Sequence, residues 1–317
     1  MIDRPKVLLL GNGLLQAFGG ESWNDFLNSI KRRDDLDNDL SKIICPEPLK
    51  AILVTGDKVD VAMRAKCEKL LSNNDFSEDL SDMLRLILSM GFDHILTTNY
   101  TYEIEQAAIY PESLSESKLK KMSKSTAGRV EGKYLIHTYS RVVFEDRENK
   151  VWHIHGEARK PDSTILGHYY YGNLLCKIRE EVKKIDECRW ERMAEKNASW
   201  IDAFLFGDIY CIGFGFGFSE FDLWWLLNRK AREKNNYGKM YFYEPFDIKY
   251  WAKIDLLNLM KNSNGEHIVE VINQGYKTNS EINWRQYYKD VIEDISRKLN
   301  AEEGNMIEMS KDLAMIV

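Results

Sequence analysis

The 317-residue sequence has no Cys-x-x-Cys pair and no long apolar run. Its five cysteines are an odd number at scattered positions, which argues against both a zinc ribbon and a disulfide framework. We therefore expect reduced thiols, as in cytosolic proteins. No apolar stretch reaches the roughly 18 residues that a membrane-spanning helix needs. Arg4 and Lys6 lead directly into the first apolar segment, so we expect no signal peptide and a soluble, cytoplasmic protein.

The sequence also lacks an excess of positive charge. Lys and Arg total 44 against 50 Asp and Glu, which gives a net charge of -6. Nucleic-acid-binding surfaces are basic, so this balance predicts no direct binding of nucleic acid, and nothing in it indicates a membrane surface. The 44% apolar fraction can bury a substantial core. The length suits one large domain or two modest ones.

The first glycine-rich turn follows a short apolar segment. Lys6–Leu10 is a continuous apolar run, which fits a strand covered on both faces, as in a parallel sheet. The following Gly11-Asn12-Gly13 permits the close backbone approach that a phosphate-binding turn needs, and Leu14–Phe18 can form a short helix. The complete Gly-x-Gly-x-x-Gly fingerprint is absent because position 16 is Gln, and a plain strand-to-helix turn would look the same.

A second glycine-rich turn follows a later strand. The apolar segment Asp208–Ile212 runs into Gly213-Phe214-Gly215-Phe216-Gly217. We expect Ser219 to cap the next helix, with Asp222 three residues on as the acidic partner of a capping box. Two glycine-rich turns that each feed a helix favour a nucleotide site more than either turn alone.

Two other expected strands end in polar residues. His94–Tyr100 places Asn99 at its end, and Val151–His155 places His155 just before a glycine. Strand alternation would put His153 and His155 on one face. Open α/β sheets bind ligands at the carboxyl edge of the strands. Taken alone, each residue is better explained by a structural role. Asn99 can form a turn or cap a helix, and His155 can be hydrogen-bonded to neighbouring backbone.

The remaining segments complete the expected architecture. Glu244 ends a strand at Lys239–Pro245, where it could accept a ribose hydroxyl or simply belong to a surface turn. Further strands are expected at Tyr134–Thr138 and His267–Ile272, a surface loop at Ser113–Lys133, and a final helix at Ile282–Leu299.

Strands that alternate with helical segments predict an α/β fold, a Rossmann-like doubly wound and mostly parallel sheet with helical insertions. We expect residues 1–300 to form one domain, with insertions at about 31–90 and 157–200, and residues 301–317 to form an amphipathic C-terminal tail. Four strand ends carry the residues of interest: Gly11/Gly13, Asn99, His155 and Gly213/Ser219. All four lie at the carboxyl edge of the expected sheet, and this coincidence favours a functional interpretation of His155 over a structural one.

These motifs, in this order, resemble the sirtuin superfamily, most closely the bacterial sirtuin-like domains of anti-phage defence. The resemblance runs from about Lys6 to Glu244 and implies a single NAD-binding domain. In it, Asn99 would lie against the nicotinamide ribose, and His155 would be the catalytic base. Residues 11–14 would hold the diphosphate, and Gly213 and Ser219 would approach the adenosine half. The residues expected to bind NAD are Gly11, Asn12, Gly13, Leu14, Asp25, Thr98, Gly213, Ser219 and Glu244.

The departures from the family pattern bear on the reaction. Sirtuins that deacylate proteins carry a four-cysteine zinc module, which the cysteines here cannot form, so the resemblance points away from deacylation. Leu27 replaces the arginine of the loop over nicotinamide, and Thr101 replaces the usual aspartate after Asn-Tyr. Defence-type members hydrolyse NAD. The resemblance therefore implies an NAD glycohydrolase that depletes NAD during infection.

The implied reaction needs few groups. Nicotinamide is already a cationic leaving group, so the departing ring requires no general acid and the reaction no metal. Asn99 can orient water and ribose, and His155, with an ordinary pKa of about 6.5, can act as base near neutral pH. NAD is the substrate, and the product is linear or cyclised ADP-ribose.

Such an activity must be gated, and the family precedent is assembly into a homo-oligomer or with a defence partner such as a helicase-type ATPase. The alternative functions are a non-catalytic NAD or ADP-ribose sensor, an ADP-ribosyltransferase, or a deacylase.

Overall fold

The computed structural model describes residues 4–37, 39–72, 76–128, 131–187, 199–232, 238–245, 247, 251–277 and 282–314, the side chains of residues 72 and 302–314 excepted. Cys188 and tail residues 315–317 lie outside this part of the chain.

The fold is built on one eight-stranded sheet with the strand order β3-β4-β5-β2-β1-β6-β7-β8. Pairings among β5, β2, β1, β6, β7 and β8 are parallel, and β3 and β4 add an antiparallel edge. This confirms the predicted α/β, Rossmann-like and mostly parallel sheet. The strands are β1 (Lys6–Leu10), β2 (His94–Thr97), β3 (Ser123–Ser125), β4 (Thr138–Phe144), β5 (Arg147–His153), β6 (Asp208–Ile212), β7 (Met240–Tyr243) and β8 (Val269–Ile272).

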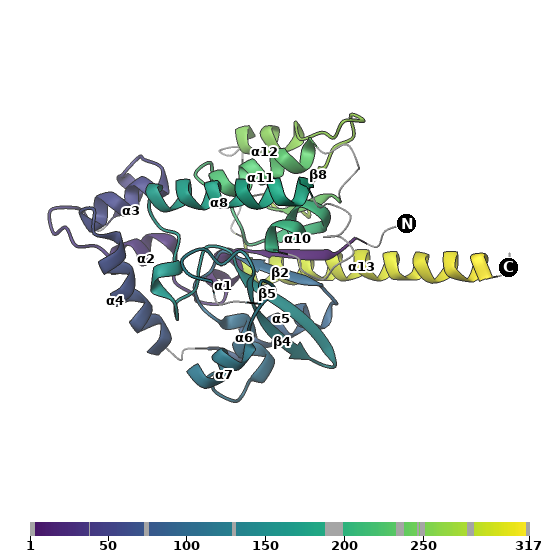
Figure 1. Ribbon diagram of the computed structural model, residues 1–317, viewed down its shortest axis with the longest axis horizontal. Coiled ribbons are helices and arrows are strands. Elements are labelled where there is room, and N and C mark those ends of the chain that lie inside the picture. The colour runs from purple at the N-terminus through teal and green to yellow at the C-terminus, as the bar shows by residue number, and fades with distance from the viewer. Residues whose placement is uncertain are drawn as a thin grey trace.

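Helices cover both faces of the sheet (Figure 1). Successive residues of β1 point to opposite faces, so Val7 and Leu9 belong to one apolar core and Leu8 and Leu10 to the other. The first core is covered by α8 (His168–Glu187), α10 (Trp200–Phe206), α11 (Phe221–Ala231) and α12 (Trp251–Asn258). The second is covered by α1 (Asn12–Ala17), α5 (Glu78–Ser89), α6 (Glu103–Ile109) and α13 (Trp284–Ala314).

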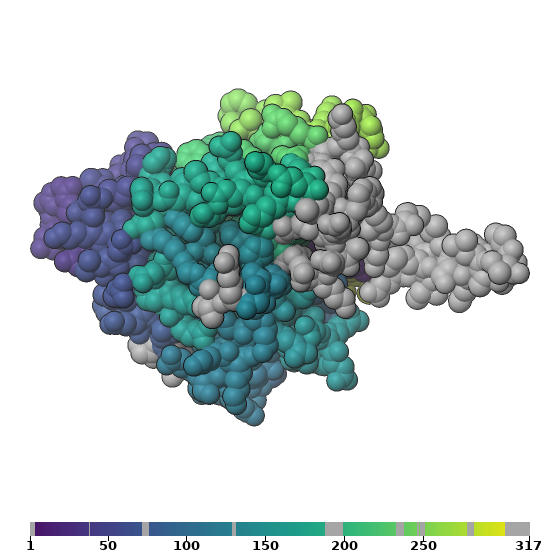
Figure 2. Space-filling model, viewed as in Figure 1, coloured from purple at the N-terminus to yellow at the C-terminus, as the bar shows by residue number. Residues whose placement is uncertain are grey.

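A third, smaller core lies in a helical lobe at the left of Figures 1 and 2. It is formed mainly by α2 (Trp23–Ser29), η1 (Leu40–Lys42), α3 (Glu47–Thr55) and α4 (Val59–Ser72). Ser22 caps α2, because its side chain accepts a hydrogen bond from the backbone N–H of Asp25. The remaining short helices are α7 (Glu116–Met122) and η2 (Pro161–Ser163).

The prediction failed around β4. Residues 134–137 are not a strand, because the strand begins at Thr138 and forms a hairpin with β5. The connecting turn is Glu145-Asp146, and both residues have positive φ angles, 46° and 62°. A two-residue hairpin turn of this kind is normally marked by Asn-Gly or Asp-Gly, so the sequence carries no clear signal for it. The expected loop at Ser113–Lys133 likewise contains α7 and β3.

The final helix is longer than expected. It runs without interruption from Trp284 to Ala314 and so passes the expected start of the tail at residue 301. The division into one domain and a tail stays a prediction. Within the described part of the chain, no helix is both long and apolar enough to cross a bilayer.

The two glycine-rich turns pack against each other. The backbone N–H of Gly11 donates to Ile212 (3.0 Å), and that of Gly13 donates to Gly213 (2.7 Å). A Cβ atom on Gly11 would lie 2.4 Å from the Gly213 carbonyl oxygen. The glycines therefore let the ends of β1 and β6 meet, and two of the N–H groups expected to face a phosphate are used in that contact.

We predict that Gly11→Ala destabilises the fold by about 1–3 kcal/mol, because the new methyl group would overlap backbone atoms that cannot yield. Gly215→Ala is the matched control, since a Cβ atom there meets nothing within 4 Å. That change should alter stability by no more than about 0.5 kcal/mol. Urea unfolding measures both, and equal midpoints for the two variants would contradict this packing.

Candidate active site

A cavity of about 1600 Å³ lies where β1, β2, β5 and β6 end. Ligand pockets commonly measure roughly 300–1000 Å³, so this cavity can hold a dinucleotide. Its wall includes residues that follow each of the four strands: Asn12 and Gly13 after β1, Thr98 and Asn99 after β2, His155 after β5, and Gly213, Gly215 and Glu220 after β6. The carboxyl edge of the sheet is thus the candidate site, as the sequence predicts.

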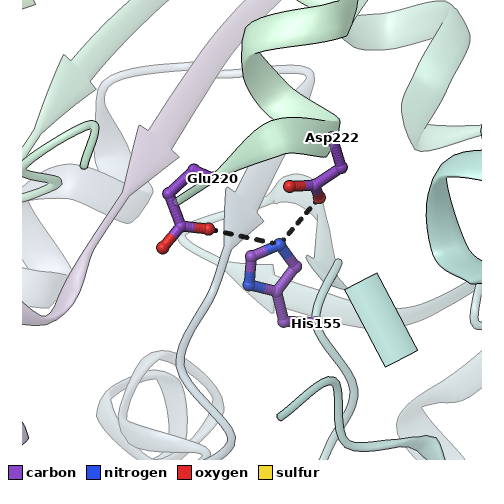
Figure 3. Close-up of side chains that lie close together, drawn as sticks. All are labelled: His155, Glu220 and Asp222. Atoms are coloured by element: carbon purple, nitrogen blue, oxygen red, sulfur yellow. Dashed lines mark hydrogen bonds and ion pairs between the residues drawn. The ribbon is translucent and has the colours of Figure 1, made fainter. Parts of the chain in front are cut away.

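His155 is held by acidic residues at the start of α11 (Figure 3). Its Nε2 atom lies 2.9 Å from Oδ2 of Asp222 and 3.9 Å from Oε2 of Glu220. The side chains of His155 and Asp222 are 4% and 0% exposed. Burial alone would lower the pKa of His155, but the charges of Asp222 and Glu220 and the Asp222 hydrogen bond outweigh burial and raise it.

The Asp222 contact decides which ring nitrogen of His155 carries the proton. A carboxylate only accepts hydrogen bonds, so Nε2 must be the protonated nitrogen. Among the described residues, Nδ1 has no hydrogen-bond partner. In Figure 3, Nδ1 lies on the ring edge away from Asp222. In the neutral imidazole, Nδ1 therefore keeps a free lone pair.

Glu220 is the second carboxylate at this site. Burial and the charge of Asp222 raise its pKa to about 7, against the opposing effects of His155 and Tyr171. The hydroxyl of Tyr171 donates to Glu220 (3.2 Å). One ligand atom from each of His155, Glu220 and Asp222 lies within 4.8 Å of the others, so the three side chains could hold a metal ion. Reasoning from the sequence did not identify this group.

Asn99 presents its side chain to the cavity while its backbone is fixed. Its N–H donates to the hydroxyl of Thr97 (3.1 Å), and its carbonyl accepts from Nδ1 of His153 (2.8 Å). Among the described residues, its side-chain amide has no partner. Asn99 does not cap α6, because the cap position is Tyr102. The amide is therefore available to a ligand.

His153 does not share a face with His155, contrary to the prediction from alternation. Strand β5 ends at His153, so the alternation stops before His155. His153 binds Glu105 of α6 (3.1 Å), on the opposite side of the sheet from α11. Burial opposes its charge, but Glu105 outweighs burial and raises the pKa of His153 to about 9. The resulting buried imidazolium holds the Asn99 backbone.

The structure brings together only part of the predicted site. The predicted residues that line the cavity are Asn12, Gly13, Thr98, Asn99, His155 and Gly213. The predicted residues outside the lining are Gly11, Leu14, Asp25, Ser219 and Glu244.

Four of the five residues outside the lining make other contacts. Gly11 packs on the β6 turn, and Leu14 is fully buried in the core. Asp25 accepts a hydrogen bond from Ser22 (2.6 Å). Glu244 is ion-paired with Lys253 of α12, at 2.6 Å, and its contact with a ribose stays a prediction.

The expected capping box before α11 is wrong. The helix begins at Phe221, its cap position is Glu220, and no side chain caps it, so Ser219 is not the cap. Asp222 binds His155 instead. Reasoning from sequence thus missed Glu220, Asp222 and Tyr171 as site residues. The spacing Glu-x-Asp after a glycine-rich turn was the available signal.

We predict that the His153–Glu105 pair stabilises the protein most at low pH. The pKa of His153 is raised from 6.5 to about 9 on folding, so the stabilisation is complete below pH 6.5 and is lost as the pH rises through 9. The stability difference between wild type and Glu105→Gln should therefore shrink from pH 6 to pH 9.5 in denaturant unfolding. Glu148→Gln, at an exposed ion pair, should show no such trend. A pH-independent difference for Glu105→Gln would contradict the ion pair.

Comparison with curated proteins found no significant match. The sequence model of the SIR2-like domain family matches residues 93–268, more than half of the chain. The matched range contains Asn99, His155, Glu220 and Asp222, and it confirms the resemblance to the sirtuin superfamily. SIR2-like domains use NAD, which fits a cavity that is wide enough for a dinucleotide at the carboxyl edge of the sheet. The chain belongs to the SIR2-like domain family.

Proposed function

We propose that the protein is an NAD glycohydrolase that cleaves the bond between nicotinamide and ribose. The main support is that Asn99 and His155 line the same cavity, and that the Asn99 amide and Nδ1 of His155 have no hydrogen-bond partner among the described residues. Simple binding of a nucleotide requires neither a buried base nor a carboxylate that orients it. The family supports NAD as the ligand.

The cavity suggests how NAD would lie. Gly215 and Gly217 line it and have open space beside them, so backbone at the β6 turn can approach a ligand closely. Asn12 lines the cavity at the start of α1. We place the diphosphate and adenosine half along these two turns, and the nicotinamide ribose between Asn99 and His155.

In the proposed reaction, the bond between ribose C1′ and the pyridinium nitrogen breaks, and nicotinamide leaves with the bonding electrons as a neutral molecule. Water then forms a bond to C1′ and gives its proton to Nδ1 of His155. Asp222 and Glu220 stabilise the imidazolium that results, much as an aspartate does for the histidine of a catalytic triad. Transfer of that proton to solvent restores the enzyme.

The proposed biological role is depletion of NAD in the cytoplasm during anti-phage defence. It rests on the sequence resemblance to defence-type sirtuin-like domains. An NAD hydrolase would harm its own cell unless gated, so we propose activation by assembly, as a homo-oligomer or with a defence partner such as a helicase-type ATPase.

The proposal is tested by an HPLC time course of NAD with the purified protein, alone and with the product of a neighbouring gene. Nicotinamide and ADP-ribose, linear or cyclised, should appear in equal amounts. NAD that is bound but never consumed would instead indicate a sensor. Transfer of label from NAD to protein would indicate an ADP-ribosyltransferase.

We predict that Asn99→Ala and His155→Ala each abolish NAD consumption, because one removes the group that orients the ribose and the other removes the base. General acid–base catalysis typically contributes a factor of about 10²–10⁴, so residual rates should fall by at least that much. His137→Ala is the control, since His137 is a histidine outside the cavity lining. Circular dichroism should show an intact fold, and a His155→Ala enzyme with the wild-type rate would overturn the assignment.

Asp222→Asn should lower kcat by about 10²–10⁴ and leave KM for NAD nearly unchanged. The amide can donate to Nε2, which would move the proton to Nδ1 and remove the free lone pair. Steady-state kinetics at fixed pH measure the effect. A loss confined to KM would mean that Asp222 serves binding rather than the orientation of the base.

A further inference from the structure

We propose that His155, Glu220 and Asp222 form a binding site for one divalent transition-metal ion of the zinc type, and that the bound ion keeps the NAD site inactive. The inhibitory part rests on the proposed function, whereas the binding part does not. The ion would regulate the site and take no part in the reaction.

The spacing of the ligand atoms fits a single ion. Zinc binds imidazole nitrogen and carboxylate oxygen at about 2.0–2.2 Å, so two ligands of a tetrahedral ion are about 3.4 Å apart. The separations from Nε2 of His155, 2.9 Å to Asp222 and 3.9 Å to Glu220, lie on either side of that value. The ligand oxygens of Glu220 and Asp222 lie within 4.8 Å of each other, so binding would draw the three groups toward the common spacing of about 3.4 Å.

The site has two carboxylates, Glu220 and Asp222, beside a single imidazole. Asp222 is fully buried, and its Oδ1 atom has no hydrogen-bond partner among the described residues. Figure 3 shows this second oxygen on the side of Glu220. Two carboxylates elsewhere in the fold have cations nearby: the buried Glu157 lies near Arg159 and Lys160, and the partly buried Glu244 pairs with Lys253.

Among the described residues, the imidazole of His155 is the only cationic partner of Glu220 and Asp222. No lysine or arginine in this part of the chain pairs with either carboxylate. A divalent cation would neutralise both carboxylates, and bidentate coordination by Asp222 would also give its Oδ1 atom a partner.

The ligand types select the class of ion. Imidazole suits zinc, copper and nickel, whereas magnesium and calcium prefer all-oxygen sites. His155 and Glu220 line the cavity, which offers a route for the ion and a position for water as a fourth ligand. The site therefore fits Zn²⁺ better than Mg²⁺.

Binding at Nε2 would disable the base by a change of tautomer. The ion needs the lone pair of Nε2, so the proton now on that atom must leave. A neutral imidazole then carries its proton on Nδ1, which can no longer accept one from water. No bond in NAD is involved, and no oxidant or reductant is needed. The same ion also occupies the carboxylates that would stabilise the imidazolium.

The test uses the full chain, freed of metal by a chelator and titrated with ZnCl₂ by calorimetry. We expect one tight equivalent of Zn²⁺, no binding of Mg²⁺ at the same concentration, and at least tenfold weaker Zn²⁺ binding in Glu220→Gln and Asp222→Asn. Glu181→Gln is the matched control, because Glu181 is also a buried carboxylate beside a histidine, 3.5 Å from His137. Cys176→Ser controls for zinc captured by an exposed thiol.

Wild-type affinity in both site variants, or no tight equivalent at all, would overturn the site. If Asp222→Asn fails to fold, as judged by circular dichroism, Glu220→Gln alone decides. The inhibitory part requires that Zn²⁺ stops NAD hydrolysis and that the chelator restores it; an unchanged rate at saturating Zn²⁺ refutes it. A protein that binds Zn²⁺ through these residues but never hydrolyses NAD would refute the proposed function and leave the site standing.

Discussion

One buried hydrogen bond, from Nε2 of His155 to Asp222, joins the turn after β5 to the first turn of α11. Both side chains are almost fully buried, so removal of either partner would leave a polar or charged group without compensation, at a cost of about 3–5 kcal/mol. The bond fixes the tautomer of His155, and the same helix turn brings Glu220 to the cavity wall. The chemistry of the site therefore depends on where α11 begins.

The rest of the fold supplies the frame for that contact. Parallel pairing aligns the ends of β1, β2, β5 and β6 at one edge. The hydrogen bonds from Gly11 to Ile212 and from Gly13 to Gly213 hold two of those ends together. His153, which is ion-paired with Glu105, binds the backbone carbonyl of Asn99. His153 and His155, two residues apart in the sequence, thus lie on opposite faces of the sheet. His153 stabilises the structure, and His155 acts in the proposed reaction.

The sequence predicts the parts of this arrangement that depend on local pattern. Apolar runs mark β1 and β6, and the polar residues after two strands mark Asn99 and His155. The roles of individual residues are mispredicted where two interpretations of the same local pattern compete. An acid three residues after Ser219 fits a capping box, yet Asp222 binds a histidine far away in the sequence. The position of Glu244 at the end of a strand is also that expected of a ribose acceptor, but in the fold Lys253 lies beside it and forms an ion pair. Such pairings depend on the packing of distant segments, which no local pattern specifies.

We propose that this cavity holds NAD with its nicotinamide ribose between Asn99 and Nδ1 of His155. A crystal structure with a carbocyclic, uncleavable NAD analogue would show whether it does. We expect the Asn99 amide and Nδ1 to lie within hydrogen-bond distance of the ribose or its attacking water, with Nε2 still bound to Asp222. An analogue bound with its nicotinamide end far from His155, or a ring turned so that Nε2 faces the ligand, would contradict it.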